Sequence, residues 1–459
     1  MPELHALLVG TAVAAPVVAF AMLATLIWGR DSVSERAVVD ITRFAFFVSL
    51  VASLSLMTWS FLGAHSFLVD LGPWFEVGSH SFRITFLLDR LSTSLMTLTT
   101  GAATLIGYFS RTYLHGERGH PRFYLLLNVF AAGMLILVSA GSLDFLFVGW
   151  EIVGLTSALL IAFFHERSDP VRNGLRAFIT YRICDVGLLT GTIMLHHFAH
   201  NANFQPELGP GHWVAGTAHL DTGAATLVAL LFLLGAMGKS AQLPFGGWLP
   251  RAMEGPTPSS AIFYGALSVH AGVYLLIRLT PLLEDAPLAS AAVIAVGAVT
   301  TVLGTLTGRV QTDVKSALAY ATMTQIGLMF VEVGLHLPGL ATVHLLSHAT
   351  LRIWQLLRAP AILHEMHSLQ GALDHEFETG RWLDNIERKF KGPLGAFLYQ
   401  RALDRFYFDD IGDRFVVAPI LWTAQRFAWL EARLVSAKSS GGVRRGPETV
   451  SDRQLEKVS

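Results

Sequence analysis

Charged residues are scarce in this sequence. Only 15% of its 459 residues are Asp, Glu, Lys or Arg, whereas 52% are hydrophobic, and the mean hydropathy is +0.50. Soluble domains carry about 25% charged residues, so the composition excludes an ordinary soluble protein. The 33 basic and 34 acidic residues nearly cancel, so no excess charge indicates nucleic acid or an anionic surface as the main partner. A polytopic helical membrane protein is the class that fits.

Cysteine is almost absent, and cofactor motifs are missing. The one cysteine, Cys184, lies in an apolar stretch and cannot form an internal disulfide. The sequence has no metal-ligand spacing, no P-loop and no dinucleotide fingerprint. Three clustered histidines, His196, His197 and His200, lie near a predicted helix end, where an interfacial role is favoured over a metal site. We expect the chain to hold no flavin, iron–sulfur cluster or quinone by itself, so any enzymatic activity belongs to a larger complex.

Long apolar runs are what the sequence has instead. A membrane-spanning helix needs about 20 mainly apolar residues, and the alternation typical of a membrane barrel does not occur. The first run lacks a basic leader and a convincing cleavage motif, which indicates a retained helix rather than a signal peptide. We predict an all-α bundle with eleven spans, at residues 5–28, 42–62, 84–109, 123–141, 143–164, 177–198, 223–247, 260–280, 289–308, 316–335 and 339–360.

Positive charge is confined to alternate loops. The long loop at residues 201–223 contains no Lys or Arg, and Arg83 is nearly the only basic residue in the loops on its side. The positive-inside rule therefore places the N-terminus outside and the remaining loops in the cytoplasm. Those remaining loops hold eleven basic residues, namely Arg30, Arg36, Arg111, Arg118, Arg122, Arg167, Arg172, Arg176, Arg251, Arg309 and Lys315.

The character of the sequence changes after residue 360. Residues 361–435 are first polar and Gly-interrupted, and then aromatic and amphipathic in RFYFDDIGDRFVVAPILWTAQRFAWLEARLV. That second part could lie along the membrane surface or form a poorly hydrophobic twelfth span over residues 411–434. Residues 436–459 are rich in Ser, Gly and charge, and we expect a disordered tail there.

Six of the ionisable residues inside the predicted spans form a set of candidates. Each costs roughly 2.5–3.5 kcal/mol on insertion, so such residues usually face a bundle interior or a hydrated path. Taken singly, each could equally form a salt bridge that only packs helices. A Glu and a Lys on nearby spans favour a proton relay, because a close carboxylate stabilises the ammonium whereas desolvation destabilises it. The six are Glu151, Arg182, Asp185, Lys239, Glu332 and Arg352.

Lys239 lies just before a predicted helix break, in GKSAQLPFGGW. Pro244 cannot donate to the helical ladder, and its ring opposes the carbonyl of Ser240. The two glycines that follow weaken the helix further. Broken helices occur at membrane depth only where they line a cavity or are buried in protein. The pattern favours a functional break in the seventh span, with a plain kink or the end of the span as the alternative.

Four segments together resemble one family: WEIVGLTSALLIAFF, RICDVGLL, GKSAQLPFGGWLPRAMEGPTPSSA and QTDVKSALAYATMTQIGLMF. They are similar to the antiporter-like membrane subunits of respiratory complex I and of Mrp-type cation/proton antiporters, and most of all to the large, subunit-L-type members. The resemblance covers roughly residues 80–365. It implies proton-translocating five-helix units of inverted topology, each with a broken helix, that work beside other membrane subunits.

The resemblance also implies roles for particular residues. Glu151 and Lys239 match the coupled pair of the family, and Arg182 and Asp185 match supporting charges beside it. We therefore expect Lys239 to be the central proton carrier and Glu151 to be the carboxylate that modulates it.

Three more positions match the family with an open alternative. Lys315, in TDVK, matches a basic residue near the cytoplasmic side, where a positive-inside anchor is nearly as good an interpretation. His344 and His348, in HLLSHATLR, match histidines that extend the polar axis towards the second unit. Hydrogen bonds that only pack helices are the alternative for these two.

The sequence departs from the family pattern in three ways. Tyr264 stands where the family commonly has a histidine, and His270, six residues later, is expected to face the other way on a helix of 3.6 residues per turn, on a different path or on none. Arg352 stands where a lysine is typical and, being always protonated, is a poor switch. Residues 281–360 supply only three spans of a second unit, without a second broken helix.

These patterns divide the chain into residues 1–122, with three spans; 123–280, the first five-helix unit; 281–360, the partial second unit; the amphipathic segment 361–435; and the tail 436–459. The function expected is proton, or sodium, translocation in the inner (plasma) membrane by a non-redox subunit of an NADH:quinone oxidoreductase-type complex. The alternative is the ion-coupling membrane subunit of a DAB-type inorganic carbon transporter, whose partner would be a large soluble zinc-containing protein resembling a carbonic anhydrase. A self-sufficient solute transporter and a subunit whose charges only pack helices are less favoured.

Overall fold

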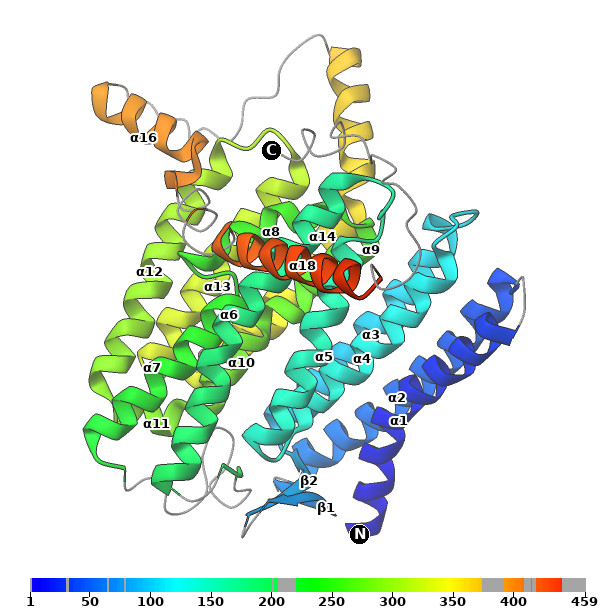
Figure 1. Cartoon of the computed structure of the whole chain (residues 1–459), viewed down its shortest axis with the longest axis vertical. Helices are drawn as coiled ribbons and strands as arrows, with labels where there is room; N and C mark the ends of the chain where they lie inside the picture. The colour runs from blue at the N-terminus through cyan, green and yellow to red at the C-terminus, as the bar shows by residue number, and fades with distance from the viewer. Residues whose placement is uncertain are drawn as a thin grey trace. The chain divides into compact units, whose positions relative to one another are not determined.

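The structure, a computed structural model, describes residues 2–29, 33–63, 66–77, 80–199, 202–204, 220–373, 392–407, 414 and 418–439. The chain divides into two units, residues 1–409 and 410–459. Helices dominate the first unit (Figure 1). Among the described residues, nine helices are long and apolar enough to cross a membrane.

Each of the eleven predicted spans coincides with helical structure. The continuous helices are α1 (Pro2–Gly29), α2 (Glu35–Gly63), α3 (Arg90–Tyr113), α4 (His120–Ser139), α5 (Leu143–Ile161), α6 (Ser168–Ala199), α7 (Thr222–Lys239), α12 (Pro287–Arg309), α13 (Val314–Gly334) and α14 (Pro338–Leu373). An irregular helical segment, Thr257–Arg278, forms the remaining span.

Two of the predicted spans, α3 and α14, are not among the nine long apolar helices, so the predicted count of 11–12 exceeds the nine. The sequence of α3 is rich in Ser and Thr. Their hydroxyls donate to carbonyls one turn back, as Thr97 does to Thr93 at 2.9 Å and Ser110 does to Ile106 at 2.7 Å. These hydroxyls are therefore satisfied within their own helix, which lets a polar sequence remain helical and partly buried.

A β-hairpin was missed by the all-α prediction. Strands β1 (Phe67–Val77) and β2 (His80–Leu88) pair antiparallel, and Asp70 pairs with Arg83 at 2.7 Å across them. The third predicted span, at 84–109, is therefore wrong at its start. Asp89 ends the hairpin and caps α3, where its side chain accepts from the backbone N–H of Ser92 at 2.8 Å. Aromatic and β-branched residues suit a half-buried hairpin. The boundary between β2 and α3 was missed because both elements lie in one apolar run of the sequence.

The predicted break in the seventh span is present. Helix α7 ends at Lys239, eight residues before the predicted end, and η2 (Phe245–Gly247), α8 (Trp248–Arg251) and η3 (Ala252–Glu254) follow. The indole N–H of Trp248 donates to the carbonyl of Gly238 at 3.0 Å, and Thr300 accepts from the N–H of Leu243 at 3.1 Å. Side chains thus satisfy backbone groups that the interrupted helix leaves free.

The centre of the first unit is the segment Thr257–Arg278, whose most apolar stretch is completely buried. It consists of α9 (Thr257–Ser259), the π-helix η4 (Ser260–Ala266), the 3-10 turn η5 (Ser268–His270) and α10 (Ala271–Arg278). The short helix α11 (Thr280–Glu284) follows. Segments of α7, α13 and α14 pack on α10, so residues of this segment can contact both halves of the bundle.

A buried ion pair fastens α3 to the end of α10. Arg278 and Asp89 are 1% and 2% exposed, and the guanidinium bonds to both carboxylate oxygens. Arg278 also donates to the hydroxyl of Tyr274 at 3.0 Å, which donates in turn to the carbonyl of Val138 in α4 at 2.9 Å. This pair was not predicted from the sequence, because both residues lie at predicted span ends, where charge is ordinary.

The described parts of the C-terminal region are helical. In the first unit, α16 (Pro393–Leu403) leads into the turn η6 (Arg405–Tyr407). In the second unit, α18 (Ala418–Ser439) reaches past the predicted boundary at 436, and it is not among the candidate spans. Residues 374–391 and 440–459 lie outside the described residues, and the predicted disordered tail falls mostly there.

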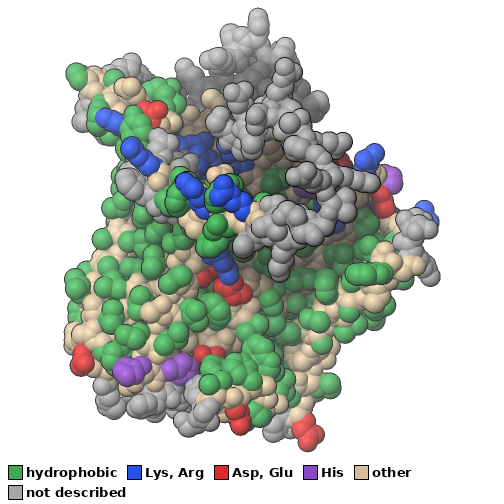
Figure 2. All heavy atoms as spheres, in the orientation of Figure 1, with side chains coloured by type: hydrophobic (Ala, Val, Ile, Leu, Met, Phe, Trp, Pro, Cys, Tyr) green, Lys and Arg blue, Asp and Glu red, His purple; other side chains and the backbone are tan. Residues whose placement is uncertain are grey.

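The surface of the first unit carries a broad hydrophobic zone. In Figure 2, hydrophobic side chains cover the middle of the visible face, whereas Asp, Glu and His side chains gather along its lower edge. Exposed hydrophobic side chains of the first unit include those of Leu159, Val186, Leu189, Ile193 and Leu227. A hydrophobic belt bordered by polar groups is the surface that a bilayer requires.

Candidate functional site

Lys239 is the first lysine in the sequence, and its side chain is 1% exposed. It occupies the last residue of α7, directly before the helix break. Its Nζ donates to the carbonyl of Trp150 in α5 at 3.0 Å and lies 4.6 Å from the ring centroid of Tyr181 in α6. The predicted carrier therefore has a carbonyl oxygen and aromatic faces as its nearest partners, which can hold an ammonium without neutralising it.

The two predicted carboxylates share one partner, Arg182. Its guanidinium forms an ion pair with Glu151, and its other terminal nitrogen lies 2.7 Å from Asp185 Oδ2. The indole N–H of Trp150 donates to Asp185 Oδ1 at 2.5 Å. Among the described residues, no ion pair joins Glu151 to Lys239. The structure thus brings all four predicted residues together, but it inserts Arg182 where a direct Glu–Lys pair was expected.

A glycine in α5 lets these groups approach one another. A Cβ atom built on Gly154 would lie 2.6 Å from Nζ of Lys239 and 3.3 Å from a guanidinium nitrogen of Arg182. The sequence quoted for the family resemblance, WEIVGLTS, contains this glycine, but only the packing reveals why a side chain is absent there. The glycine makes the space into which both cations extend.

The charges of this first cluster balance when every member is ionised, with Glu151 and Asp185 against Arg182 and Lys239. Arg182 remains protonated under all ordinary conditions. Only the lysine and the two carboxylates can exchange a proton. A change in the contacts of Arg182 would therefore alter the balance at Lys239 without any chemistry at the arginine itself.

A second polar cluster joins α13 and α14. His344 lies 2.8 Å from Glu332 and 2.9 Å from Gln325 through its two ring nitrogens. The ring centroids of His344 and His348 lie 6.3 Å apart, and His348 Nε2 lies 3.1 Å from a guanidinium nitrogen of Arg352. The predicted His344, His348 and Arg352 are thus brought together, with Glu332 as the acidic member.

His270 contacts this second cluster, and it faces away from Tyr264 as the sequence predicts. Its Nε2 lies 3.0 Å from Nδ1 of His348. The backbone between Tyr264 and His270 is not the regular helix assumed from the sequence, because residues 260–266 form a π-helix with i→i+5 bonds. Tyr264 instead donates to the carbonyl of Ser157 in α5 at 2.7 Å.

Hydroxyl groups lie between the two clusters. Ser240, directly after Lys239, donates to the carbonyl of Val269, directly before His270, at 2.8 Å. Ser157 in α5 donates to Ser268 at 3.3 Å. These hydroxyls were not singled out from the sequence, because Ser in a membrane helix carries little signal by itself. The clusters are therefore neighbours across the central segment.

Lys315 lies in the first turn of α13, which Asp313 caps by accepting from the N–H of Ser316 at 2.7 Å. Among the described residues, no hydrogen bond or ion pair links Lys315 to either cluster. Its predicted role stays a prediction, and the alternative of a positive-inside anchor suits its place beside a helix end.

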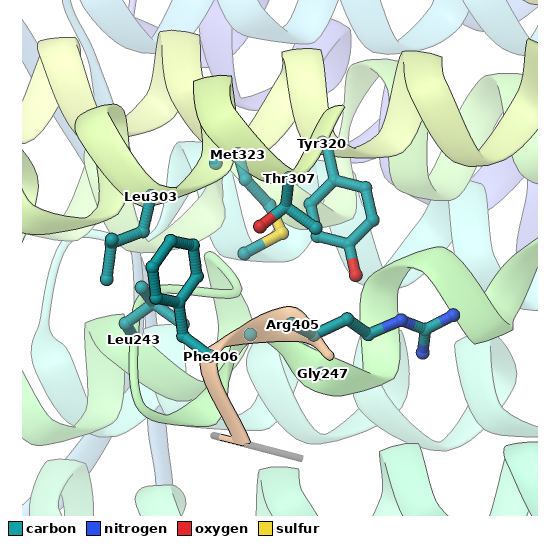
Figure 3. Close-up of a pocket in the computed structure, with 10 residues that line it drawn as sticks. Leu243, Gly247, Leu303, Thr307, Tyr320, Met323, Arg405 and Phe406 are labelled. Carbon is teal, nitrogen blue, oxygen red and sulfur yellow. The ribbon is translucent and has the colours of Figure 1, made fainter. Parts of the chain in front are cut away.

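A small cavity of about 20 Å³ lies beside the helix break (Figure 3). Figure 3 shows the ring of Phe406 next to Leu243 and Leu303, with Arg405 extending from the same turn past Gly247. Arg405 and Phe406 have positive φ angles of 53° and 54°, a conformation that few residues other than glycine adopt. The turn η6 thus narrows the space next to the break.

Within the described residues, no three His, Cys, Asp or Glu side chains lie together in a way that could hold a metal ion.

Comparison with protein families gives two matches. Residues 121–376 match the family described as "NADH:quinone oxidoreductase/Mrp antiporter, TM", and residues 74–124 match "NADH-Ubiquinone oxidoreductase (complex I), chain 5 N-terminus". The two clusters and the helix break all lie inside the first match.

Individual proteins are similar over the same region. NADH-quinone oxidoreductase subunit L of Escherichia coli (strain K12) is 36% identical over 361 residues, which cover 78% of this chain and 57% of that protein. The subunit L of Pseudomonas aeruginosa is 40% identical over 311 residues, which cover 67% and 49%. The chain thus spans about half the length of the curated relatives it matches.

Two solved structures share the fold. A chain of the Mrp complex from Dietzia sp. DQ12-45-1b superposes with a TM-score of 0.64 and 28% identity, over 75% of this chain and 37% of that one. A chain of the membrane-bound sulfane sulfur reductase, an archaeal respiratory membrane complex, gives a TM-score of 0.65 over 76% and 70% of the two chains, and at 18% identity this likeness concerns the fold alone.

Proposed function

This chain belongs to the NADH:quinone oxidoreductase/Mrp antiporter family of multi-pass membrane subunits, and from that premise we propose that it conducts protons as the non-redox membrane subunit of a larger complex. The observation that carries the proposal is the buried ammonium of Lys239, which stands at a helix break with a carbonyl oxygen as its hydrogen-bond partner. A buried amine releases its proton more readily than one in water, because desolvation favours its neutral form, and a nearby carboxylate favours its reprotonation.

The first cluster supplies a means of control. Arg182 contacts Glu151 and Asp185 at once. Release of either carboxylate by Arg182 would leave a negative charge near Lys239 and favour its protonated form, whereas the present pairing favours proton release. In this proposal Glu151 and Asp185 modulate the carrier and Arg182 moves between them.

In this proposal the second cluster continues the proton path beyond the first cluster. Glu332, His344 and His348 are titratable groups within one packed region of α13 and α14. Imidazoles can accept and donate protons near neutral pH. Arg352 orders His348 and holds positive charge, and it exchanges no proton itself.

A proton suits these groups better than a sodium ion. Sodium, a hard cation, needs several oxygen ligands and is repelled by neighbouring ammonium and guanidinium groups. Lys239 and Arg182 lie in the first cluster and Arg352 lies in the second. A chain of amines and imidazoles instead offers nitrogen lone pairs, which bind protons.

The orientation and the location follow from the loops. The basic loops favour a cytoplasmic position, which would place the N-terminus and the hairpin β1–β2 outside the inner membrane. We propose that other membrane subunits accompany the chain, since its relatives are named as subunits of such complexes. Lys315 would anchor the cytoplasmic end of α13.

The experiment that tests this proposal has two steps. The tagged chain is first purified in mild detergent, and the proteins that accompany it are identified by mass spectrometry. The assembly is then reconstituted in vesicles, and proton and sodium movements are measured with separate fluorescent indicators. Co-purifying membrane subunits and proton movement support the proposal, whereas sodium movement without proton movement contradicts it.

The same experiment decides the alternative of inorganic carbon transport. That alternative relies on residues 364–407 as a docking segment for a soluble partner, and part of this segment lies outside the described residues. Co-purification of one large soluble zinc protein, together with bicarbonate accumulation in cells, would replace the respiratory assignment and leave proton conduction as the coupling step.

A further inference from the structure

A groove between α2 and α3 opens on the surface of the first unit, away from both polar clusters. It has a volume of about 680 Å³ and is lined by side chains from residues 40–50 of α2 and 101–108 of α3. The two helices pack on each other and lie on one flank of the unit, drawn in blue and cyan in Figure 1. A Cβ atom built on Gly101 would have no neighbour within 4 Å, so the groove is open at that residue.

The groove has a polar end and an apolar end. Asp40 and Arg43 line it near the start of α2, whereas Phe47 and Leu50 line it further along the helix. Helix α3 runs the other way, so Tyr108 lies at the polar end. A membrane lipid has the same polarity, with a head group at one end and acyl chains at the other.

The polar end lies on the side of the basic loops. The start of α2 meets the end of α3 there, because Nδ1 of His115 lies 2.7 Å from one carboxylate oxygen of Glu35 and the N–H of Gly116 donates to the other at 3.0 Å. In the proposed orientation these residues border the cytoplasm. The groove would therefore open to the cytoplasmic leaflet.

The length of α2 sets the depth of the two charges. Its 29 residues span about 43 Å, which matches a bilayer of about 40–45 Å with its head groups included. Asp40 and Arg43 lie five and eight residues after Glu35, which is about 8 Å and 12 Å along the axis. Both therefore lie near the boundary between head groups and hydrocarbon, where a long side chain can reach the phosphates.

Arg43 and Asp40 are available to a ligand. Their side chains are 48% and 73% exposed, and the closest nitrogen and oxygen of the pair lie 3.8 Å apart, which is too long for a hydrogen bond. A guanidinium that faces lipid is costly unless it reaches a polar partner. Guanidinium groups bind phosphate, and a carboxylate accepts hydrogen bonds from an ammonium group.

We propose that this groove binds phosphatidylethanolamine from the cytoplasmic leaflet. Arg43 binds the phosphate, Asp40 accepts from the primary ammonium, and one acyl chain lies along Phe47 and Leu50. The order of the charges fits, because the phosphate lies between the acyl chains and the amine, and Asp40 lies about 4.5 Å closer to the cytoplasm than Arg43. The inference rests on the proposed function for its orientation only and uses none of its proton chemistry.

Other occupants fit the groove less well. Residues 40–50 of α2 rise about 15 Å, and a neighbouring helix of about 10–12 Å diameter occupies roughly 1,200–1,700 Å³ over that length. The groove offers about 680 Å³. An anionic lipid without an amine would leave Asp40 beside a second negative charge.

The experiment measures lipid binding without transport. The full chain with its co-purifying partners is delipidated in detergent and then mixed with phosphatidylethanolamine, phosphatidylcholine or phosphatidylglycerol, each with the same photoactivatable acyl chain. All three lipids carry the phosphate, but choline has no N–H to donate and glycerol carries no positive charge. We expect phosphatidylethanolamine to crosslink to peptides of α2 and α3 about fivefold more than either of the others, the upper end of what one exposed ion pair contributes.

Single substitutions separate the parts of the site. Arg43→Gln should lower the crosslinking of all three lipids, whereas Asp40→Asn should remove only the preference for phosphatidylethanolamine. Gly101→Leu should lower all crosslinking, because its side chain fills the apolar end. Thermal unfolding should not change, since the two charged side chains are exposed and Gly101 has open space beside it. The matched control is Arg172→Gln, an exposed arginine of α6 outside the groove, which should bind lipid as the wild type does.

Two results would overturn the inference. One is equal crosslinking of the three lipids, or an Asp40→Asn variant that keeps the wild-type preference. The other is a photoreactive amino acid at position 47 that crosslinks in native membranes to a co-purifying subunit instead of lipid, because the occupant would then be a protein helix. Either result would leave proton conduction intact, and a chain that conducts no protons would leave the lipid site intact.

Discussion

The guanidinium of Arg182 pairs with the carboxylate of Glu151, and the same guanidinium holds Asp185 at 2.7 Å. The direct neighbour of Glu151 is therefore an arginine that cannot lose its proton. Lys239 can lose its proton, and its Nζ donates to the carbonyl of Trp150 at 3.0 Å. Control of the lysine by the carboxylates must then act through the position of Arg182.

Replacement of Arg182 by lysine tests this control. A lysine ammonium is a point charge that cannot hold two carboxylates in fixed geometry as a planar guanidinium does. We expect Arg182→Lys to assemble normally and to lose at least about tenfold in proton flux, which corresponds to about 1.4 kcal/mol. Flux equal to that of the wild type would show that only the positive charge at this position matters.

Gly154→Ala should impair transport without unfolding the chain. The added Cβ would lie 2.6 Å from Nζ of Lys239, so the flexible end of the lysine must shift away from its carbonyl partner. Alanine also gains about 1 kcal/mol in helix propensity over glycine, which keeps the fold intact. The matched control is Gly101→Ala in α3, where nothing lies within 4 Å of the new atom. Proton flux and thermal unfolding are measured for both variants. Equal proton flux in the two would contradict the close approach of Lys239 to Gly154.

The buried pair of Arg278 and Asp89 is expected to hold the bundle together. Removal of one partner of a buried ion pair typically costs about 3–5 kcal/mol, because the other charge is left uncompensated. Asp89→Ala should therefore lower the thermal unfolding midpoint in detergent strongly. The double variant Asp89→Leu/Arg278→Met should lose much less. A double variant as unstable as the single one would show that the pair is not the origin of the effect.

The hairpin should be sensitive to acid through Asp70. Burial raises the pKa of this carboxyl, but hydrogen bonds from Arg83 and the N–H of Gly72, with the charge of Arg83, outweigh burial and hold the pKa below its ordinary value of 3.8. A depressed folded-state pKa adds stability that is present above pH 3.8 and is lost as the pH falls through the folded value. Hydrogen exchange of hairpin amides should rise in that acid range in the wild type. Asp70→Asn should show higher exchange already at neutral pH and little further acid response; an unchanged acid response would assign the effect to another group.

Most of the helices could be predicted from the sequence, because a bilayer demands apolar runs of a fixed length. The break after Lys239 could also be predicted, since Pro244 and the glycines after it weaken any helix. The hairpin at residues 67–88 could not, because its apolar strands merge with the next helix in a hydropathy pattern. Sequence spacing predicted that His270 and Tyr264 face different sides, but it did not predict the contact of His270 with His348 or the π-helix before it.

The members of the site were easier to predict than their pairing. Charged residues inside apolar runs stand out, so the sequence could single out Glu151, Arg182, Asp185 and Lys239, which the structure brings together. Which cation meets which carboxylate depends on helix rotation and on the space beside Gly154, and sequence spacing fixes neither. Partners such as Trp150 and Ser240 act through a carbonyl and a hydroxyl, which composition does not distinguish from ordinary packing.

The most direct test of the account is proton flux through the assembled complex that carries Lys239→Arg, compared with the wild type in the same vesicles. The arginine keeps the positive charge but cannot release its proton at ordinary pH, so the account predicts normal assembly and the loss of proton flux. Wild-type flux in this variant would show that position 239 supplies only charge, and it would contradict the central claim that Lys239 is loaded and unloaded.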